Sequence, residues 1–273
     1  MTLLHSLLFS EPHIDCCHLS YRAFIYAWAR TGGREGAIKA DYYLHLMLTD
    51  FEEGFSDVLP KTRTFNAVIE AWLRSDLNDS VQKILHILKR MEKLSSESLP
   101  NERSYTNFIR ALSSSNVPLR ANKAYDVIKR MNLMVEKGNR YARPTEFSYN
   151  AVLAACANDI GNEEAFDIAI KAFGELTKNS KPDSVSYNNL LRVCLLLDGN
   201  KRKNVAKATF KQCSNKGFVK RNTIYVLRDL LSDEDFYSLT GTLSVDNAFE
   251  NIPIEWKRNA EAKAARRKSR GRN

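Results

Sequence analysis

A ten-residue phrase recurs six times along this chain, and that recurrence limits the possible folds more than any other feature. The copies read SYRAFIYAWA from residue 20, TFNAVIEAWL from 64, SYTNFIRALS from 104, SYNAVLAACA from 148, SYNNLLRVCL from 186 and, less regularly, TIYVLRDLLS from 223. Their second residues lie at positions 21, 65, 105, 149, 187 and 224, so successive copies are 44, 40, 44, 38 and 37 residues apart. Self-similarity at such a period is the signature of a repeat architecture.

Each copy predicts a helix with one apolar face. In the fourth copy, Tyr149, Val152, Leu153 and Cys156 fall at i, i+3, i+4 and i+7, the spacing of a single helical stripe. A Ser or Thr opens every copy, and we expect this residue to be the helix N-cap. Because Cys156 and Cys194 share one register position, they are expected in the core rather than in a metal or nucleophile role.

A second amphipathic stretch follows each of these helices. Polar or glycine-containing breaks such as RTGGREG separate the two, and loops such as LPKTRT or KPDSVS lead into the next copy. One helical pair cannot bury its own apolar face, so stacked neighbours must cover it. We therefore predict an all-α fold, a right-handed α-solenoid of stacked helix-turn-helix repeats over residues 18–240. Its units are expected to start near residues 18, 62, 102, 146, 184 and 221.

The rest of the chain divides into three segments. Residues 1–17 are expected to be an N-terminal segment, either truncated or a partial repeat, and 241–256 a capping segment in which Trp256 covers the last helix. Residues 257–273 hold eight Lys or Arg and one Glu, a net charge of +7, whereas residues 1–256 hold 33 basic and 31 acidic residues, a net of +2. The basicity is thus mostly in the tail, which is expected to be disordered; contact with RNA or a ribosome is left open.

The sequence lacks the signals that mark several classes of protein. No apolar run approaches the roughly 18 residues of a membrane-spanning helix, so no membrane insertion is expected. The five cysteines form no C-x-x-C pair, and no histidine matches the H-x-E motif of a zinc deaminase. The acidic cluster of Asp233, Glu234 and Asp235 is expected to be the solvated start of a short helix. We expect no enzymatic activity, no cofactor and no metal.

The phrases KPDSVSYNNLL, RPTEFSYNAVL and LPKTRTFNAVI resemble the pentatricopeptide repeat, and the resemblance extends over residues 18–240. Here the units are longer than is usual in that family, a departure that surface loops such as KLSSES can absorb. The resemblance implies a protein that binds single-stranded RNA at one base per repeat. It also implies a mitochondrial or plastid location, although the first residues, with no Lys or Arg before Arg22, show no targeting peptide.

In this family the main base readers are the residue after the repeat's aromatic position and the last residue of the unit. On this sequence they pair Arg22 with Lys61, Asn66 with Asn101, Thr106 with Thr145, Asn150 with Asp183, and Asn188 with Lys220. We expect the three asparagines of this register to be exposed and to face RNA. The two pairs that contain lysine do not match the family's pattern, and their units are expected to bind phosphate or nothing.

The chemistry of these side chains predicts pyrimidine preference. An amide can donate and accept, whereas an ionised Asp only accepts. Asp183 therefore suits a base that presents a ring N–H, as uracil does and cytosine does not, and we expect uracil at the fourth unit. We expect either pyrimidine at the second unit. Thr106 resembles the family's purine-reading type, although Thr145 is not its usual partner.

Two further sets of residues are implied by the same resemblance. The residue before each Ser or Thr occupies the position that sandwiches the base, and an arginine or an apolar side chain can stack there. These residues are Arg63, Arg103, Phe147 and Val185. Four residues beyond the reading position, Arg110 and Arg192 share its helical face; they are candidate phosphate contacts, or alternatively part of an ordinary solvated surface.

The leading hypothesis is therefore a sequence-selective, pyrimidine-favouring binder of single-stranded RNA that acts in organellar RNA processing, stability or translation. Organellar RNA-processing or ribosomal proteins are its expected protein partners. The alternative is a protein-interaction solenoid, such as a structural component of an organellar ribosome. Two observations favour this alternative: about five readable units specify only about five nucleotides, and the repeat region is nearly neutral.

Overall fold

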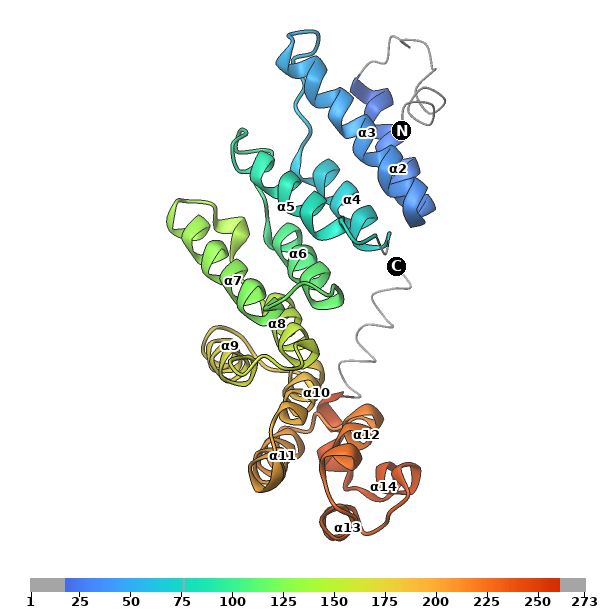
Figure 1. Cartoon of the computed structure of the whole chain (residues 1–273), viewed down its shortest axis with the longest axis vertical. Helices are drawn as coiled ribbons and strands as arrows, with labels where there is room; N and C mark the ends of the chain where they lie inside the picture. The colour runs from blue at the N-terminus through green and yellow to red at the C-terminus, as the bar shows by residue number, and fades with distance from the viewer. Residues whose placement is uncertain (1–17, 76, 261–273) are drawn as a thin grey trace. The chain divides into compact units, whose positions relative to one another are not determined.

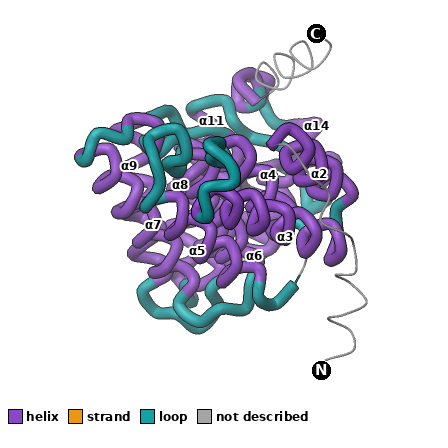
Figure 2. The backbone as a smooth tube through the Cα atoms, turned by 90° about the horizontal axis from the view of Figure 1, so that it is seen from above, coloured by secondary structure: helices purple, strands orange, loops and turns teal. Residues whose placement is uncertain are grey.

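A computed structural model describes residues 18–75 and 77–260 of the 273-residue chain. All regular structure in these residues is helical, with no strand, so the predicted all-α class is confirmed (Figure 2). None of the helices in these ranges is both long and apolar enough to cross a bilayer. The chain forms two compact units, residues 1–107 and 108–273, which are described separately below.

The first unit contains two complete helical pairs and the start of a third. Its helices are α2 (His18–Thr31), α3 (Gly33–Glu52), α4 (Thr62–Leu73), α5 (Ser80–Met91) and the beginning of α6 (Glu102–Ser114) (Figure 1). Helix α2 packs against α3 and α4, and α4 packs against α3 and α5. Each first helix of a pair thus contacts its own second helix and the next first helix, the contact pattern of a repeat array.

The second unit continues from the rest of α6. It contains α7 (Arg120–Glu136), α8 (Glu146–Asn158), α9 (Ala165–Asn179), α10 (Ser184–Val193), α11 (Gly199–Asn215), α12 (Arg221–Leu230), α13 (Asp233–Thr240) and α14 (Val245–Asn251). Short 3-10 turns lie at Arg140–Ala142, Cys194–Leu196 and Ile254–Trp256. The first helices α8, α10 and α12 pack in succession, and the second helices α7 and α9 pack against each other (Figure 1).

The six first helices begin at the residues where the six units were expected to start: His18, Thr62, Glu102, Glu146, Ser184 and Arg221. The aromatic position of the repeat is buried from the second repeat to the sixth, for example Phe65 and Tyr149 at 0% and 1% exposure, whereas Tyr21 of the first repeat is half-buried. Cys156 and Cys194 are fully buried, so the prediction that they belong to the core is confirmed. Burial raises the pKa of both thiols.

The predicted N-cap was wrong by three residues. The recurring Ser or Thr is the third residue of α4, α6, α8, α10 and α12, and the cap is the last residue of the preceding loop. In α10 the Asp183 carboxylate accepts from Ser186 N at 3.1 Å, while Ser186 Oγ accepts from Asp183 N at 3.0 Å. This reciprocal arrangement is a capping box. Asn101 with Ser104 and Thr145 with Ser148 repeat it at α6 and α8.

The C-terminal end of the second unit is closed by the chain itself. Helix α14 packs against α12, and the Trp256 ring meets Phe210 edge to face at 5.7 Å between centroids. Asn259 N and Ala260 N each donate to Gly217 O at 3.0 Å. The expected tail therefore does not begin at Lys257, because the chain stays docked to Ala260. Residues 1–17 and 261–273 lie outside the described part, so the expectations for those segments stay predictions.

One residue of the acidic cluster is buried, contrary to the expectation that the cluster is solvated. Helix α13 does begin at Asp233 with Ser232 as its N-cap, but the third acidic residue is buried rather than solvated. Asp235 forms ion pairs with Lys203 and with Lys207, the latter at 2.5 Å, and these hydrogen bonds lower the pKa of its carboxyl. Two lysines of α11 explain the burial, because a carboxylate leaves water only when it is paired.

Candidate nucleic-acid interface

The first helices present one repeated register of buried and exposed side chains. In α4, α6, α8, α10 and α12 the second helical residue is exposed and the third and fourth are buried, while the fifth ranges from buried in α4, α6 and α8 to exposed in α12. The predicted base-sandwich positions are these second residues, and all four are at the surface, with Phe147 53% and Val185 40% exposed. Arg63 lies over the Tyr26 ring at 5.8 Å, and Arg103 forms an ion pair with Glu70.

The structure brings together the predicted reading pair of the second repeat, Asn66 and Asn101. Asn66 Nδ2 donates to Asn101 Oδ1 at 3.1 Å, and Ser104 Oγ donates to Asn66 Oδ1 at 2.6 Å. Asn101 Oδ1 also accepts from Ser104 N at 3.1 Å, as the cap of α6. The fifth residue of one first helix therefore lies directly against the N-cap of the next.

The fourth unit repeats this geometry with a carboxylate in place of the amide. Asn150 Nδ2 donates to Asp183 Oδ1 at 3.3 Å, and the same oxygen accepts from Val185 N at 2.9 Å. The amide oxygen of Asn150 is buried and has no hydrogen-bond partner among the described residues. The amide orientation is fixed, because the reverse would place its oxygen against the carboxylate. Two acceptors thus lie side by side.

The expectation that the reading asparagines are exposed was wrong. Asn66 is 6% and Asn150 8% exposed, and Asn188 is half-buried. Thr106, at the same register position, is 9% exposed and donates to Glu102 Oε1 at 2.9 Å. At Asn66 and Asn150 the cause is the packing of consecutive first helices, which places the next N-cap against the side chain. A ligand could reach Asn66 from the groove that this side chain lines together with Asn101.

The remaining predicted reading residues occupy several different environments. Thr106 and Thr145 belong to different units, and Thr145 caps α8 by accepting from Phe147 N at 3.2 Å. The amide oxygen of Asn188 has no partner within the described ranges, while Lys220, before α12, is exposed. Lys61 forms an ion pair with Glu97 at 3.0 Å. Arg22 is half-buried on α2.

The two candidate phosphate contacts differ from each other. Arg110 is exposed on α6. Arg192 is half-buried, and its Nη2 donates to Asn158 Oδ1 at 2.8 Å. Asn158 Nδ2 in turn donates to Ser113 O at 3.0 Å. Arg192 therefore ties α10 to α8, a structural role that limits its availability to a phosphate.

A groove in the first unit gathers several of the predicted residues. It has a volume of about 690 Å³ and lies between α2, α4 and the start of α6. Its lining includes the predicted residues Asn66, Asn101, Arg63 and Arg103. It also includes three that the sequence analysis missed: Arg30, Glu70 and Arg74. A signal for two of these existed, because Glu70 and Arg74 follow Asn66 by four and eight residues and share its helical face.

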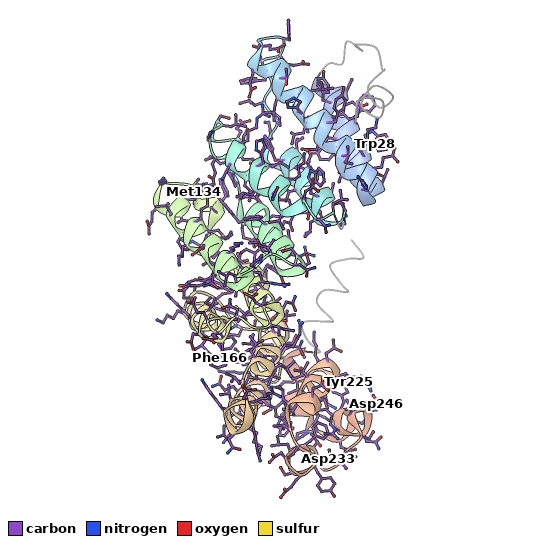
Figure 3. All side chains as sticks on the ribbon, viewed as in Figure 1. Trp28, Met134, Phe166, Tyr225, Asp233 and Asp246 are labelled. Atoms are coloured by element: carbon purple, nitrogen blue, oxygen red, sulfur yellow. The ribbon has the colours of Figure 1, made fainter. Side chains whose placement is uncertain are left out.

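The predicted reading position of the sixth repeat contacts a later helix, α14. Tyr225, the fifth residue of α12, donates from its hydroxyl to Asp246 Oδ1 at 3.4 Å (Figure 3). Because Asp246 belongs to α14, this helix covers part of the face that the other first helices use for their successors. Base reading is therefore not expected at this unit.

A second groove lies on the other side of the first unit, between α3 and α5. It has a volume of about 620 Å³, and its polar lining includes Asp41, His45, Lys83 and His86. Burial raises the pKa of Asp41, against the opposing effect of Lys83. Within the described ranges, no three His, Cys, Asp or Glu side chains are grouped so as to hold a metal ion.

Comparison with known proteins adds no family assignment. No family model matches the chain, and a search of curated proteins finds no match. The function is therefore inferred from the repeat register and from the contacts between consecutive first helices.

Proposed function

We propose that this protein is a sequence-selective binder of single-stranded RNA, built from repeats of the pentatricopeptide type and acting in a mitochondrion or plastid. Each base would enter the groove between two consecutive first helices. There it would meet the fifth residue of one helix and the N-cap of the next. The exposed second residues, such as Phe147 and Val185, would flank the base and stack on it.

The observation that carries this proposal is the unpaired amide oxygen of Asn150 beside Asp183. A buried acceptor without a donor costs about 1–3 kcal/mol, and a neighbouring carboxylate cannot relieve it. The pair therefore favours a ligand that brings an N–H group. Uracil offers an N–H between two carbonyl oxygens, whereas cytosine has an acceptor at that ring position. This chemistry supports the expected preference for uracil at the fourth unit.

The alternative function, a protein-interaction solenoid, has one observation in its favour. The groove between α3 and α5 combines apolar residues, such as Leu48 and Ile87, with a charged rim that includes Lys83 and Arg90. Such a combination suits a peptide segment better than a nucleotide. The RNA proposal is preferred because the unpaired acceptor lies at the recurring reading position, whereas none of the predicted reading residues lines this groove.

The direct test is fluorescence anisotropy of the full chain with oligouridine, oligocytidine and oligoadenosine, at low and at physiological salt. Wild-type protein is expected to bind oligouridine about tenfold more tightly than oligocytidine, which corresponds to about 1.4 kcal/mol. Asp183→Asn keeps an acceptor for the helix cap but adds an N–H donor, so it should reduce this preference. Asp198→Asn is the matched control, because Asp198 also precedes a helix but makes no side-chain cap.

The basic tail requires its own control. A full-length variant with Arg266, Arg267 and Lys268 changed to alanine removes charge without removing the docked residues before 261. Uridine preference that survives this change but is reduced in Asp183→Asn would support reading by the repeats. Binding that ignores base identity, and that disappears with the tail charges or with salt, would overturn the proposal in favour of a scaffold with a basic anchor.

A further inference from the structure

The groove between α2, α4 and the start of α6 contains a charge arrangement that base reading does not explain. Four arginines line it, namely Arg30, Arg63, Arg74 and Arg103. Glu70 is the single acidic side chain in its described lining. A groove of this composition would attract phosphate, so an acidic group among its lining residues requires a reason.

Glu70 makes specific contacts within the groove. Its Oε2 accepts from Arg103 Nη2 at 2.6 Å, and its Oε1 lies 4.0 Å from Arg74 Nη1. Arg103 is the second residue of α6, the position that would flank a base in the second unit. Glu70 itself lies one helical turn after Asn66, so the carboxylate lies on the helix face that presents the reading amide.

The ion pair is not rigidly buried. The side chain of Arg103 is 62% exposed and that of Glu70 31% exposed. Exposed pairs of this kind contribute little to stability, so a competing anion can displace the carboxylate at small cost. While the carboxylate remains, it both occupies Arg103 and repels a nearby phosphate.

We propose that Glu70 is an internal competitor for RNA phosphate. In the free protein its carboxylate binds Arg103, and a nucleotide enters the groove of the second unit when a phosphate replaces that carboxylate on the arginine. Glu70 thereby lowers the affinity of this unit for any single-stranded RNA without selecting a base. This inference rests on the proposed RNA-binding function and adds a control on affinity to it.

The test compares Glu70→Gln with wild type in the anisotropy assay with oligouridine. The variant is expected to bind about threefold to tenfold more tightly at low salt, with the gain decreasing as salt screens the groove. Because the gain decreases with salt, the plot of log K against log salt should be steeper for the variant, by no more than the roughly 0.7 of one single-strand phosphate contact. Urea unfolding of both proteins checks that the fold is unchanged.

Two variants isolate the contact from a general effect of charge. Glu52→Gln changes the net charge equally and also frees an arginine, because Glu52 Oε1 binds Arg90 Nη2 at 2.7 Å outside the groove. It is expected to leave RNA affinity within about twofold of wild type, because exposed charges distant from a ligand are screened. In an Arg103→Ala background, Glu70→Gln should lose most of its gain, because its effect acts through that arginine.

The outcomes separate this inference from the function on which it rests. Any of three results would overturn the competitor role alone. These are wild-type binding with no gain in Glu70→Gln, an equal gain in affinity in Glu52→Gln, and a gain in Glu70→Gln that persists without Arg103. Failure of every variant to bind any RNA would overturn the proposed function together with this inference. A gain confined to Glu70→Gln and dependent on Arg103 would establish the competitor.

Discussion

Replacement of Asp183 by alanine tests the central structural finding, that a predicted base reader is also a helix cap. One carboxylate oxygen of Asp183 accepts from Val185 N at 2.9 Å, Ser186 N at 3.1 Å and Asn150 Nδ2 at 3.3 Å. The residue is only 4% exposed, so water cannot readily replace these bonds. Alanine would leave all three donors without this acceptor.

The expected loss can be estimated from these contacts. Removal of a capping Asp costs about 0.5–2 kcal/mol, and an unsatisfied buried donor such as the Asn150 amide costs at least about 1 kcal/mol more. We therefore expect Asp183→Ala to lower the free energy of unfolding of the second compact unit, residues 108–273, by about 2–3 kcal/mol, whether or not RNA is present. Asp183→Asn retains an acceptor oxygen and should lose less than about 1 kcal/mol.

The assay is urea denaturation followed by far-ultraviolet circular dichroism, with Asp198→Ala as the matched control. Asp198 also precedes a helix, but its side chain makes no cap bond, so its removal is expected to change stability by less than about 0.5 kcal/mol. An Asp183→Ala loss no larger than that of Asp198→Ala would refute the capping role. It would also indicate that the carboxylate is held in place by something other than the start of α10.

Three further predictions follow from buried groups in the second unit. Asp235→Asn should lower the urea midpoint at neutral pH. Because the folded protein lowers the pKa of this carboxyl, its stabilising effect is present at pH values above the ordinary pKa of Asp and should fade as the pH falls below that pKa. Burial raises the pKa of Cys156 to about 12, Cys194 to about 11 and Cys213 to about 12, so peptide mapping after iodoacetamide should find these thiols unmodified in the native protein and modified in urea. Gly217 has φ +69°, and an added Cβ would lie 2.9 Å from a backbone oxygen; Gly217→Ala should therefore cost about 1–2 kcal/mol or more, with faster proteolysis after residue 253 as the readout.

The helical pairs were predictable because two independent signals coincide at every unit. The apolar stripe at i, i+3, i+4 and i+7 gave the helix and its buried face, and the loop before it gave the approximate start. The N-cap was misplaced because the recurring Ser or Thr is itself a strong capping residue. The sequence carries a second candidate three residues earlier, at Asn101, Thr145 and Asp183. The reciprocal motif then makes the Ser or Thr the third helical residue.

Burial of the reading residues was less accessible to sequence reasoning. A polar side chain one position after a buried aromatic falls at the edge of the helix face, and its exposure depends on what the next helix places there. That neighbour is about 33–38 residues away along the chain, as Asn150 with Asp183 and Asn66 with Ser104 show. Glu70 was missed for a related reason. Its helical register was visible, but its partner Arg103 lies in the following unit.

The proposed second role of the loop residue, base reading in addition to helix capping, would restrict which bases such an array can be made to read. Asp, Asn, Ser and Thr cap helices well, whereas Lys does not, and the two units whose pairs end in lysine have no side-chain cap at Lys61 or Lys220. In the fifth repeat the amide oxygen of Asn188 has no partner among the described residues, and the next cap position is occupied by Lys220 in place of a carboxylate. A substitution chosen to change base preference at such a position therefore also changes the stability of the following helix. Affinity comparisons between variants report base selection only after that difference in stability has been measured.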